Sequence, residues 1–205
     1  MLREPLALLS VYSLWCGLSC AVWTPPPFQP QPLRLSDPSP VDRSPLGPGA
    51  IEWVEARFLR YQTGLAPFEV RAVAQTIVES SETLGIERDL VLAVIHTESG
   101  FHAFARSRVG ALGLMQIMPE TGEMLAEELG LSWEGPETLF DPTVNVRMGI
   151  HYLAFLYEKY GSWERALAAY NWGPMRIDRR LRAGAPLPER YVAKVTGHLQ
   201  TPRLH

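Results

Sequence analysis

From residue 50 onward, apolar residues recur every three or four positions, which is the spacing of one face of an α-helix. The first such segment places Ile51, Val54 and Phe58 on one face and ends near Gly64. Proline opens several of the later segments and glycine closes most of them, as expected for helix starts and ends. The pattern predicts helices over residues 51–61, 67–84, 90–98, 119–129, 142–160, 162–170 and 188–199.

The third of these segments is apolar on every side between residues 90 and 95. Periodicity alone does not separate a buried helix from a buried strand of this length. A helix is favoured because residues 87–89 supply an acidic first turn and no second strand pattern lies nearby. Residues 110–118 are expected to form a short irregular or hairpin-like excursion. The predicted fold class is a mainly α domain with little or no β structure.

Asp141 and Ser162 stand immediately before predicted helices, where an oxygen-bearing side chain can accept a hydrogen bond from a free backbone N–H. We therefore expect both residues to act as helix N-caps.

The N-terminal residues differ in character from the rest of the chain. Residues 6–23 carry no charge and follow a short polar start that contains Arg3, the layout of a secretory signal. Three fates are open: cleavage after Ala21, lipidation of Cys20 in a degenerate lipobox, or retention as an uncleaved membrane anchor. Each of them places the following domain outside the cytoplasm, in the periplasm or cell envelope.

Residues 24–49 contain nine of the eighteen prolines. Proline fixes φ and removes a backbone donor, so this stretch favours extended polyproline II and cannot build a core. We interpret it as a semi-rigid spacer. The expected organisation is a signal peptide or membrane anchor over residues 1–23, a proline-rich linker over 24–49 and one folded domain over 50–205.

Composition excludes several classes of function. The formal net charge of −3 gives no reason to expect nucleic-acid binding, which usually needs a concentrated basic face. The two cysteines, Cys16 and Cys20, both lie in the exported stretch. The folded domain therefore has no disulfide, no cysteine nucleophile and no cysteine-ligated zinc.

Glu98 is the first candidate for chemistry. It lies at the C-terminal end of the apolar helix, where it is partly desolvated and close to the negative end of the helix dipole. Both effects favour the neutral carboxyl and raise its pKa. A carboxylic acid that stays protonated near neutral pH is what cleavage of a glycosidic bond requires.

Three further pieces carry polar or aromatic side chains beside glycines. Residues 110–117 have glycines that allow close backbone approach, and Gln116 there offers both a donor and an acceptor. Residues 169–174 end a helix in Tyr170, Asn171 and Trp172, a mixture that suits a sugar because aromatic faces cover C–H surfaces and amides contact hydroxyls. Tyr191 lies on the last predicted helix.

Taken together, the order and spacing of these pieces resemble the lytic transglycosylases of the soluble-transglycosylase, goose-lysozyme-like kind. The resemblance extends from about residue 67 to residue 199. It rests on Glu98-Ser99, on Gly113-Leu114-Met115-Gln116, on Ala169-Tyr170-Asn171 with Gly173-Pro174, and on Tyr191. The intervening Met118-Pro119-Glu120-Thr121 and Asp141-Pro142 with Asn145 also match.

The resemblance implies a lysozyme-like single domain that cleaves the β-1,4 bond between N-acetylmuramic acid and N-acetylglucosamine and leaves a 1,6-anhydro end. Glu98 would act as acid and then as base. Ser99 and Met115 would shape its pocket, and Gln116, Tyr170, Asn171 and Tyr191 would hold the acetamido sugars and Glu98. The implied partner is the peptidoglycan strand, with no metal or other cofactor, and we expect a monomer attached to the membrane or released from it.

Two residues depart from the family pattern. Thr97 precedes Glu98 where an Arg or Gln is usual, and Trp172 replaces a small residue after Asn171. These departures leave substrate preference open.

Alternative functions remain at this stage. A hydrolytic lysozyme of the inverting kind needs a second carboxylate, for which Glu120, Glu123 and Asp141 are candidates by sequence distance. A non-catalytic peptidoglycan-binding module is a second alternative. His96 and Glu98 form a His-x-Glu, but the cysteine pair that zinc deaminases add to it is missing.

Overall fold

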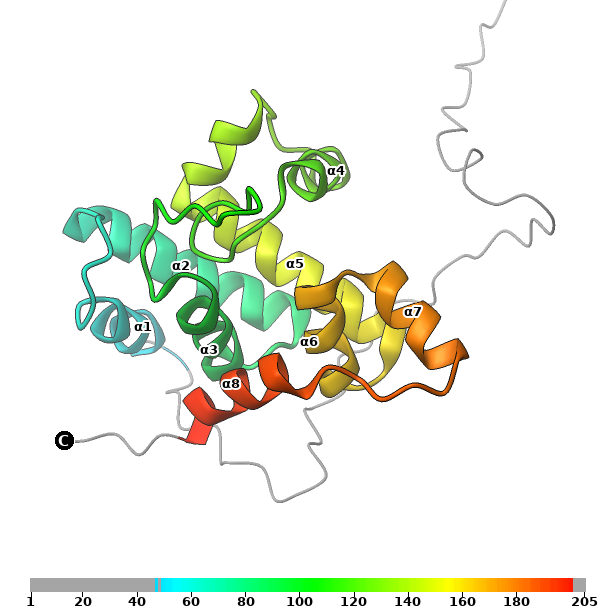
Figure 1. Ribbon diagram of the computed structural model, residues 1–205. Helices are drawn as coiled ribbons and strands as arrows, with labels where there is room; N and C mark the ends of the chain where they lie inside the picture. Colours follow the sequence, from blue (N-terminus) through cyan, green and yellow to red (C-terminus); the bar gives the residue numbers. More distant parts are fainter. Residues whose placement is uncertain (1–46, 48, 201–205) are drawn as a thin grey trace, which may run out of the picture.

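The computed structural model describes residues 47 and 49–200, and the helices there lie close to their predicted positions (Figure 1). The expected signal or anchor over residues 1–23 and the proline-rich linker lie outside the described residues, apart from positions 47 and 49. The helices are α1 Ala50–Phe58, α2 Pro67–Leu84, α3 Arg88–Ser99, α4 Pro119–Leu129, α5 Pro142–Tyr160, α6 Trp163–Trp172, α7 Pro174–Arg182 and α8 Glu189–Gln200, with a 3₁₀ helix, η1, at Pro136–Phe140.

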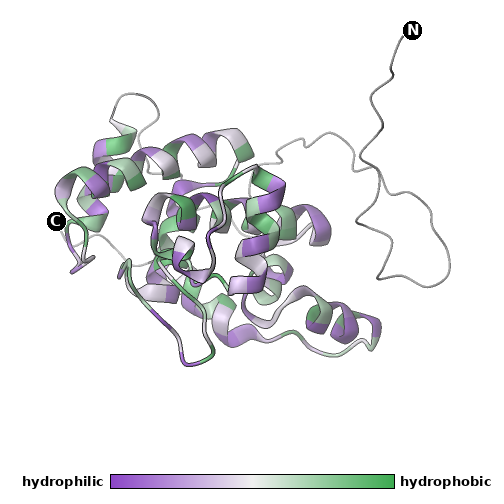
Figure 2. Cartoon of the chain, turned by 90° about the horizontal axis from the view of Figure 1, so that it is seen from above, coloured by the Kyte–Doolittle hydropathy of each residue, from purple (hydrophilic) through white to green (hydrophobic). Residues whose placement is uncertain are grey.

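A single cluster of buried side chains forms the core. Helix α5 packs against both α2 and α6, and α3 packs against α8 (Figure 1). Residues 90–95 of α3 are buried on every side, which confirms that this apolar segment is a helix of the interior. The other helices bury one face and expose polar residues on the other (Figure 2). The mainly α fold class is confirmed.

Helix ends follow the expected chemistry at α5 but not at α6. The Asp141 side chain accepts hydrogen bonds from the backbone N–H groups of Thr143 and Val144, so the predicted cap is confirmed. Ser162 occupies the N-cap position of α6, but its hydroxyl donates to Glu164 and caps no backbone group. Ser162 is therefore the N-cap residue as predicted, but the prediction that its side chain accepts a backbone hydrogen bond was wrong.

The sequence pattern did not predict α7 or η1. No helix is predicted between residues 170 and 188, but Pro174 is the first residue of α7. Proline is well suited to that position because its missing N–H has no acceptor in a first turn. Gly173 adopts a positive φ of 82° between α6 and α7, and this lets the chain turn sharply from one helix into the next.

The segment between α3 and α4 forms the expected irregular excursion. Leu112 makes isolated antiparallel bridges with Arg106 and with Ile117. Asn145 on α5 holds this loop from beneath. Its Oδ1 accepts from the Met115 N–H at 2.8 Å, and its Nδ2 donates to the carbonyl oxygens of Leu112 and Leu139 at 2.9 Å. One fully buried amide therefore ties the loop and η1 to α5.

In the described part of the chain, no helix combines the length and the apolarity needed to span a bilayer.

Candidate active site

Glu98 is the centre of the candidate site. It lies in the last turn of α3, one residue before Ser99 and the left-handed Gly100 that ends the helix. Burial raises the pKa of its carboxyl from the usual 4.5 to about 7. A hydrogen bond from Tyr191 and the positive charge of Lys194 act in the opposite direction, but burial outweighs them. Near neutral pH the group is therefore divided between its acid and base forms.

Tyr191 contacts Glu98 directly. Its hydroxyl donates to Oε1 of Glu98 at 2.6 Å, and the Tyr191 side chain is buried. Tyr191 and Lys194 are three residues apart on α8, so both project toward the same side of that helix, Tyr191 buried and Lys194 exposed. Burial, followed by the charge of Glu98, raises the pKa of the Tyr191 hydroxyl well above its usual value. This hydroxyl consequently stays a hydrogen-bond donor.

Tyr170 brings the loop of residues 110–118 into the same site. Its hydroxyl donates to the carbonyl oxygen of Met115 at 2.8 Å. Burial, followed by the charge of Glu98, raises the pKa of Tyr170 well above 10. The ring of Tyr152 lies 5.6 Å from that of Tyr170, centroid to centroid. Helix α6 therefore connects Glu98, through Tyr170, to the loop.

Met115 belongs to this loop, and its side chain is fully buried against α5. A Cβ atom at Gly149 would lie 2.7 Å from the Cβ of Met115 and would also clash with its sulfur. Glycine at position 149 thus allows α5 to approach the loop closely enough to seat Met115.

Gln116 adopts an unusual backbone conformation, with a φ of 50°. Non-glycine residues in this region are uncommon and cost of order 1 kcal/mol or more. The Nε2 group donates to the carbonyl oxygens of Ala105 and Gly113, at 3.1 and 2.9 Å. Both amide hydrogens are therefore bonded within the segment between α3 and α4, and among the described residues the carbonyl oxygen of the side chain is the atom left to contact a ligand.

Two of the expected site residues, Ser99 and Asn171, have less direct contact with the Glu98 group. Ser99 donates to the carbonyl oxygen of Ile95 within α3 and not to Glu98. Asn171 is exposed in the last turn of α6. Thr97, one of the unusual neighbours, likewise bonds the backbone of its own helix at Ala93.

The structure adds residues that the sequence motifs did not single out as functional. Lys194 and Tyr152 surround the Glu98–Tyr191–Tyr170 group, and Asn145 and Gly149 support the loop. Lys194 was detectable in principle, because it follows Tyr191 at helical spacing. Asn145 belongs to a stretch that matches the family pattern, but the sequence assigned it no role. Tyr152 and Gly149 act through contacts with segments distant in sequence, which spacing does not reveal.

The histidines and acids outside this group have other roles. The ring of His96 lies against that of His198, with 3.9 Å between centroids, and His151 bonds Glu128. Among residues 47 and 49–200, no group of three or more His, Cys, Asp or Glu side chains could hold a metal ion.

Asp141 uses one carboxylate oxygen, Oδ1, for its own helix start, where it accepts from the Thr143 hydroxyl as well as from two backbone N–H groups.

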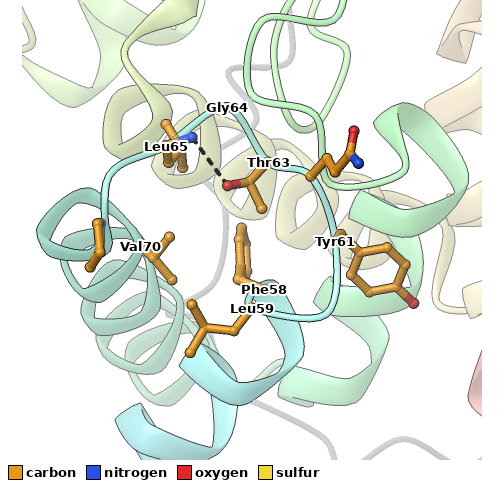
Figure 3. Close-up of a pocket in the computed structure, with 9 residues that line it drawn as sticks. Phe58, Leu59, Tyr61, Thr63, Gly64, Leu65 and Val70 are labelled. Atoms are coloured by element: carbon orange, nitrogen blue, oxygen red, sulfur yellow. Dashed lines mark hydrogen bonds between the residues drawn. The ribbon is translucent and has the colours of Figure 1, made fainter.

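A separate hollow of about 260 Å³ lies between α1 and α2, over the core ring of Phe58 (Figure 3). A hydrogen bond from the Leu65 N–H to the Thr63 hydroxyl closes its loop. Neither Glu98 nor Tyr191 lines it, so it is distinct from the candidate active site.

Comparisons with known proteins point to one family. Residues 75–190 match the family model described as the transglycosylase SLT domain. A stretch of 94 residues is 36% identical to the soluble lytic murein transglycosylase of Salmonella typhimurium and covers 45% of this chain and 15% of that protein. A stretch of 84 residues is 39% identical to membrane-bound lytic murein transglycosylase C of Pectobacterium atrosepticum, covering 40% and 24%.

A solved structure shares the fold. The inactive lytic transglycosylase Slt variant from Pseudomonas aeruginosa matches with a TM-score of 0.54 and 30% identity, over 61% of this chain and 23% of that one. This similarity confirms the lysozyme-like fold. The chain spans no more than about a quarter of the length of any of these three proteins.

Proposed function

Because the chain belongs to the transglycosylase SLT domain family, we propose that it is a lytic transglycosylase that cleaves the glycan strands of peptidoglycan. The observation that carries the proposal is the state of Glu98. Its carboxyl is desolvated, has a pKa of about 7 and is held by the Tyr191 hydroxyl at 2.6 Å. The printed names of the relatives, which are lytic murein transglycosylases, support the same activity.

In the first step, protonated Glu98 donates its proton to the glycosidic oxygen between N-acetylmuramic acid and N-acetylglucosamine. The bond from this oxygen to the muramic C1 breaks, and the substrate's own N-acetyl group stabilises the positive centre left on C1. A general acid works best when its pKa lies near the operating pH, which for Glu98 it does. Such proton transfer typically contributes on the order of 10²- to 10⁴-fold in rate.

In the second step, ionised Glu98 accepts the proton of the muramic O6 hydroxyl, and O6 bonds to C1 to close a 1,6-anhydro ring. Glu98 then has its proton again, and because O6 takes the place of water as the nucleophile, no net hydrolysis takes place. The Tyr191 hydroxyl stabilises the ionised form between the two steps, because a hydrogen bond to a carboxylate favours its charged state.

The neighbouring residues have positioning roles in this proposal. Tyr170 and Met115 form the wall behind Glu98, supported by the hydrogen bond between them. The free side-chain carbonyl of Gln116 and the exposed amide of Asn171 are suited to the acetamido and hydroxyl groups of the sugars. Ser99 shapes the pocket by its size rather than by a hydrogen bond to Glu98.

An inverting hydrolase would need a second carboxylate across the sugar. Within the described residues, the charged group that shifts the Glu98 pKa is Lys194 and not a carboxylate. Asp141 serves as a helix cap, and Glu120 lies exposed in the first turn of α4. These observations favour the mechanism with a single carboxylate.

We also propose that the protein works in the cell envelope as a monomer. The uncharged stretch within residues 1–23 supports export or membrane attachment, residues 24–49 would be the spacer, and residues 50–205 the catalytic domain. Both soluble and membrane-bound transglycosylases are among the named relatives.

Product analysis tests the proposal. Purified peptidoglycan digested with the wild-type protein should yield fragments with anhydro ends, lighter by one water than hydrolytic products in mass spectrometry. Glu98→Gln should abolish product formation while circular dichroism shows an unchanged fold, and Glu120→Gln is the matched control that should retain activity. Reducing ends in the products, or cleavage by folded Glu98→Gln, would refute the proposal.

A further inference from the structure

Helix α7 carries its positive charge on the side that faces away from the core. Figure 1 shows α7 at the edge of the molecule, where it packs against α6. Ile177 is fully buried and Leu181, four residues later, packs against the core, so these two residues define the inner side of the helix. The residues on the outer sides, which are exposed or half-exposed, are Met175, Arg176, Arg179, Arg180 and Arg182. Helix α7 therefore presents a basic surface to solvent.

The arginines of α7 form no ion pair with a carboxylate among the residues that the structure describes. Asp178, the acidic residue of this helix, instead accepts hydrogen bonds from Lys159 at 2.8 Å and from the Tyr160 hydroxyl at 2.6 Å. The charge of Arg182 acts on Asp178 as well and helps to lower its pKa. The whole chain has a formal net charge of −3, so the excess of positive charge on α7 is local.

Two exposed apolar side chains adjoin these arginines. Met175, in the first turn of α7, is 72% exposed, and Trp172, the last residue of α6, is 37% exposed. The guanidinium carbons of Arg176 and Arg180 lie 5.4 and 5.5 Å from the centroid of the Trp172 ring. Apolar and cationic groups are therefore mixed on one surface of the protein.

We propose that Trp172 and the outer side of α7 bind the headgroup region of an anionic lipid bilayer. Guanidinium groups donate paired hydrogen bonds to phosphate oxygens, and their apolar stems lie well against lipid. Tryptophan favours the boundary between headgroups and hydrocarbon, and an exposed methionine adds apolar area there. A soluble anion would engage the arginines alone, whereas a lipid surface also covers Trp172 and Met175. This contact is independent of the reaction at Glu98 and separate from the attachment proposed for residues 1–23.

The test titrates the full chain with vesicles of phosphatidylcholine, either alone or mixed with phosphatidylglycerol. The quantity to measure is the partition coefficient on the anionic vesicles divided by that on the neutral vesicles. Binding through residues 1–23 that does not depend on lipid charge cancels in this ratio. Each arginine at an anionic surface contributes a factor of about five, so Arg176→Gln combined with Arg179→Gln should lower the ratio about 25-fold. High salt should remove most of the preference of the wild-type protein, because it screens the charges.

A matched control removes the same charge elsewhere. Arg60→Gln combined with Arg147→Gln changes two exposed arginines outside α7 and should leave the ratio nearly unchanged. Circular dichroism should show the wild-type fold in both double variants, since all four side chains are exposed. An unchanged ratio for the α7 variant would overturn the inference. Equal losses in the two double variants would also overturn it, because binding would then follow net charge alone.

Fluorescence tests the apolar part of the contact. Brominated lipids quench an indole that reaches the hydrocarbon boundary, and the difference in quenching between wild type and Trp172→Phe isolates the signal of Trp172. This difference should appear with anionic vesicles, and its absence there would refute the contact. Soluble polyglutamate provides the last comparison. If the α7 double variant loses affinity for polyglutamate and keeps the wild-type ratio on vesicles, the surface binds an acidic polypeptide, and the lipid inference is wrong.

Discussion

The hydroxyl of Tyr191 donates a 2.6 Å hydrogen bond to Oε1 of Glu98, across 93 residues of sequence. It joins α8, the last helix of the described chain, to the end of α3, the most deeply buried helix. The bond lowers the pKa of a carboxyl that burial raises to about 7. The strength of the acid is therefore a balance between desolvation by the core and one donor from a distant helix.

Replacing Tyr191 by Phe removes that donor. The Glu98 pKa should then rise above about 7, because the charged form loses a hydrogen bond. Activity that requires protonated Glu98 should consequently extend to higher pH, while kcat falls on the order of tenfold through loss of a charge-assisted bond. A pH–rate profile checks this. Tyr170→Phe is the control, since its hydroxyl bonds Met115 and should leave the alkaline limb where it is.

Replacing Glu98 by Gln should change the pH dependence of stability. The folded-state pKa of Glu98 lies above its unfolded value, so the stability that the group contributes is present below pH 4.5 and is lost as pH rises toward and through 7. Gln does not titrate, so its contribution to stability does not change over this pH range. The unfolding free energy of Glu98→Gln relative to wild type should therefore increase by up to about 3 kcal/mol between pH 4 and pH 8. Urea titrations at the two pH values measure it, and a constant difference would contradict the assignment of a raised pKa.

Replacing Asn145 by Ala should destabilise the fold and disorganise the site. The change leaves the buried Met115 N–H without its acceptor and removes two donors to carbonyl oxygens, at a cost of about 2 to 4 kcal/mol. Asn171→Ala is the matched control, because Asn171 is exposed and its loss should change stability by less than about 0.5 kcal/mol. Denaturant unfolding compares the two variants, and equal stabilities would argue against the anchoring role.

Replacing Gly149 by Ala should lower the stability of the fold, whereas replacing Gly197 by Ala should raise it. Both glycines are helical, and alanine is intrinsically better in a helix by about 0.5 to 1 kcal/mol. At Gly149 the added Cβ meets Met115, so a net destabilisation of about 1 to 3 kcal/mol and reduced activity are expected. At Gly197 no atom lies within 4 Å of the added Cβ, so stability should increase. Melting temperatures of the pair check the difference, and stabilisation at both positions would exclude the close approach of α5 to Met115.

Acid should weaken the contact between α3 and α8. Burial and then the neighbouring His198 lower the pKa of His96, so the folded state holds His96 neutral. The stability that this contributes is present above pH 6.5 and is lost as pH falls through the lowered pKa. His198→Gln should raise the His96 pKa toward 6.5 and reduce the loss of stability in acid. NMR titration of the His96 ring, with unfolding at pH 5 and pH 7.5, measures both effects, and an unshifted His96 titration would contradict the coupling.

Local sequence was sufficient for most of the helices. The three- and four-residue spacing of apolar side chains, with proline before and glycine after, placed all of the α-helices except α7. Helix α7 was not predicted because the pair Gly173-Pro174 is compatible both with the end of helical structure and with a sharp turn into a new helix. The residue at the N-cap of α6 was predicted correctly as Ser162, but local sequence did not show that its side chain would bond Glu164 and no backbone N–H.

Sequence by itself determined which residue has the chemistry of an acid. A single carboxyl at the end of an apolar helix is recognisable from residue order, and the ordered motifs around it indicate the family. Only the tertiary structure decided how strong that acid is and what surrounds it. Desolvation depends on how closely α8, α6 and the loop of residues 110–118 cover Glu98, and so does the contact with Tyr191. Packing between distant segments sets these distances, and spacing along the chain does not encode them.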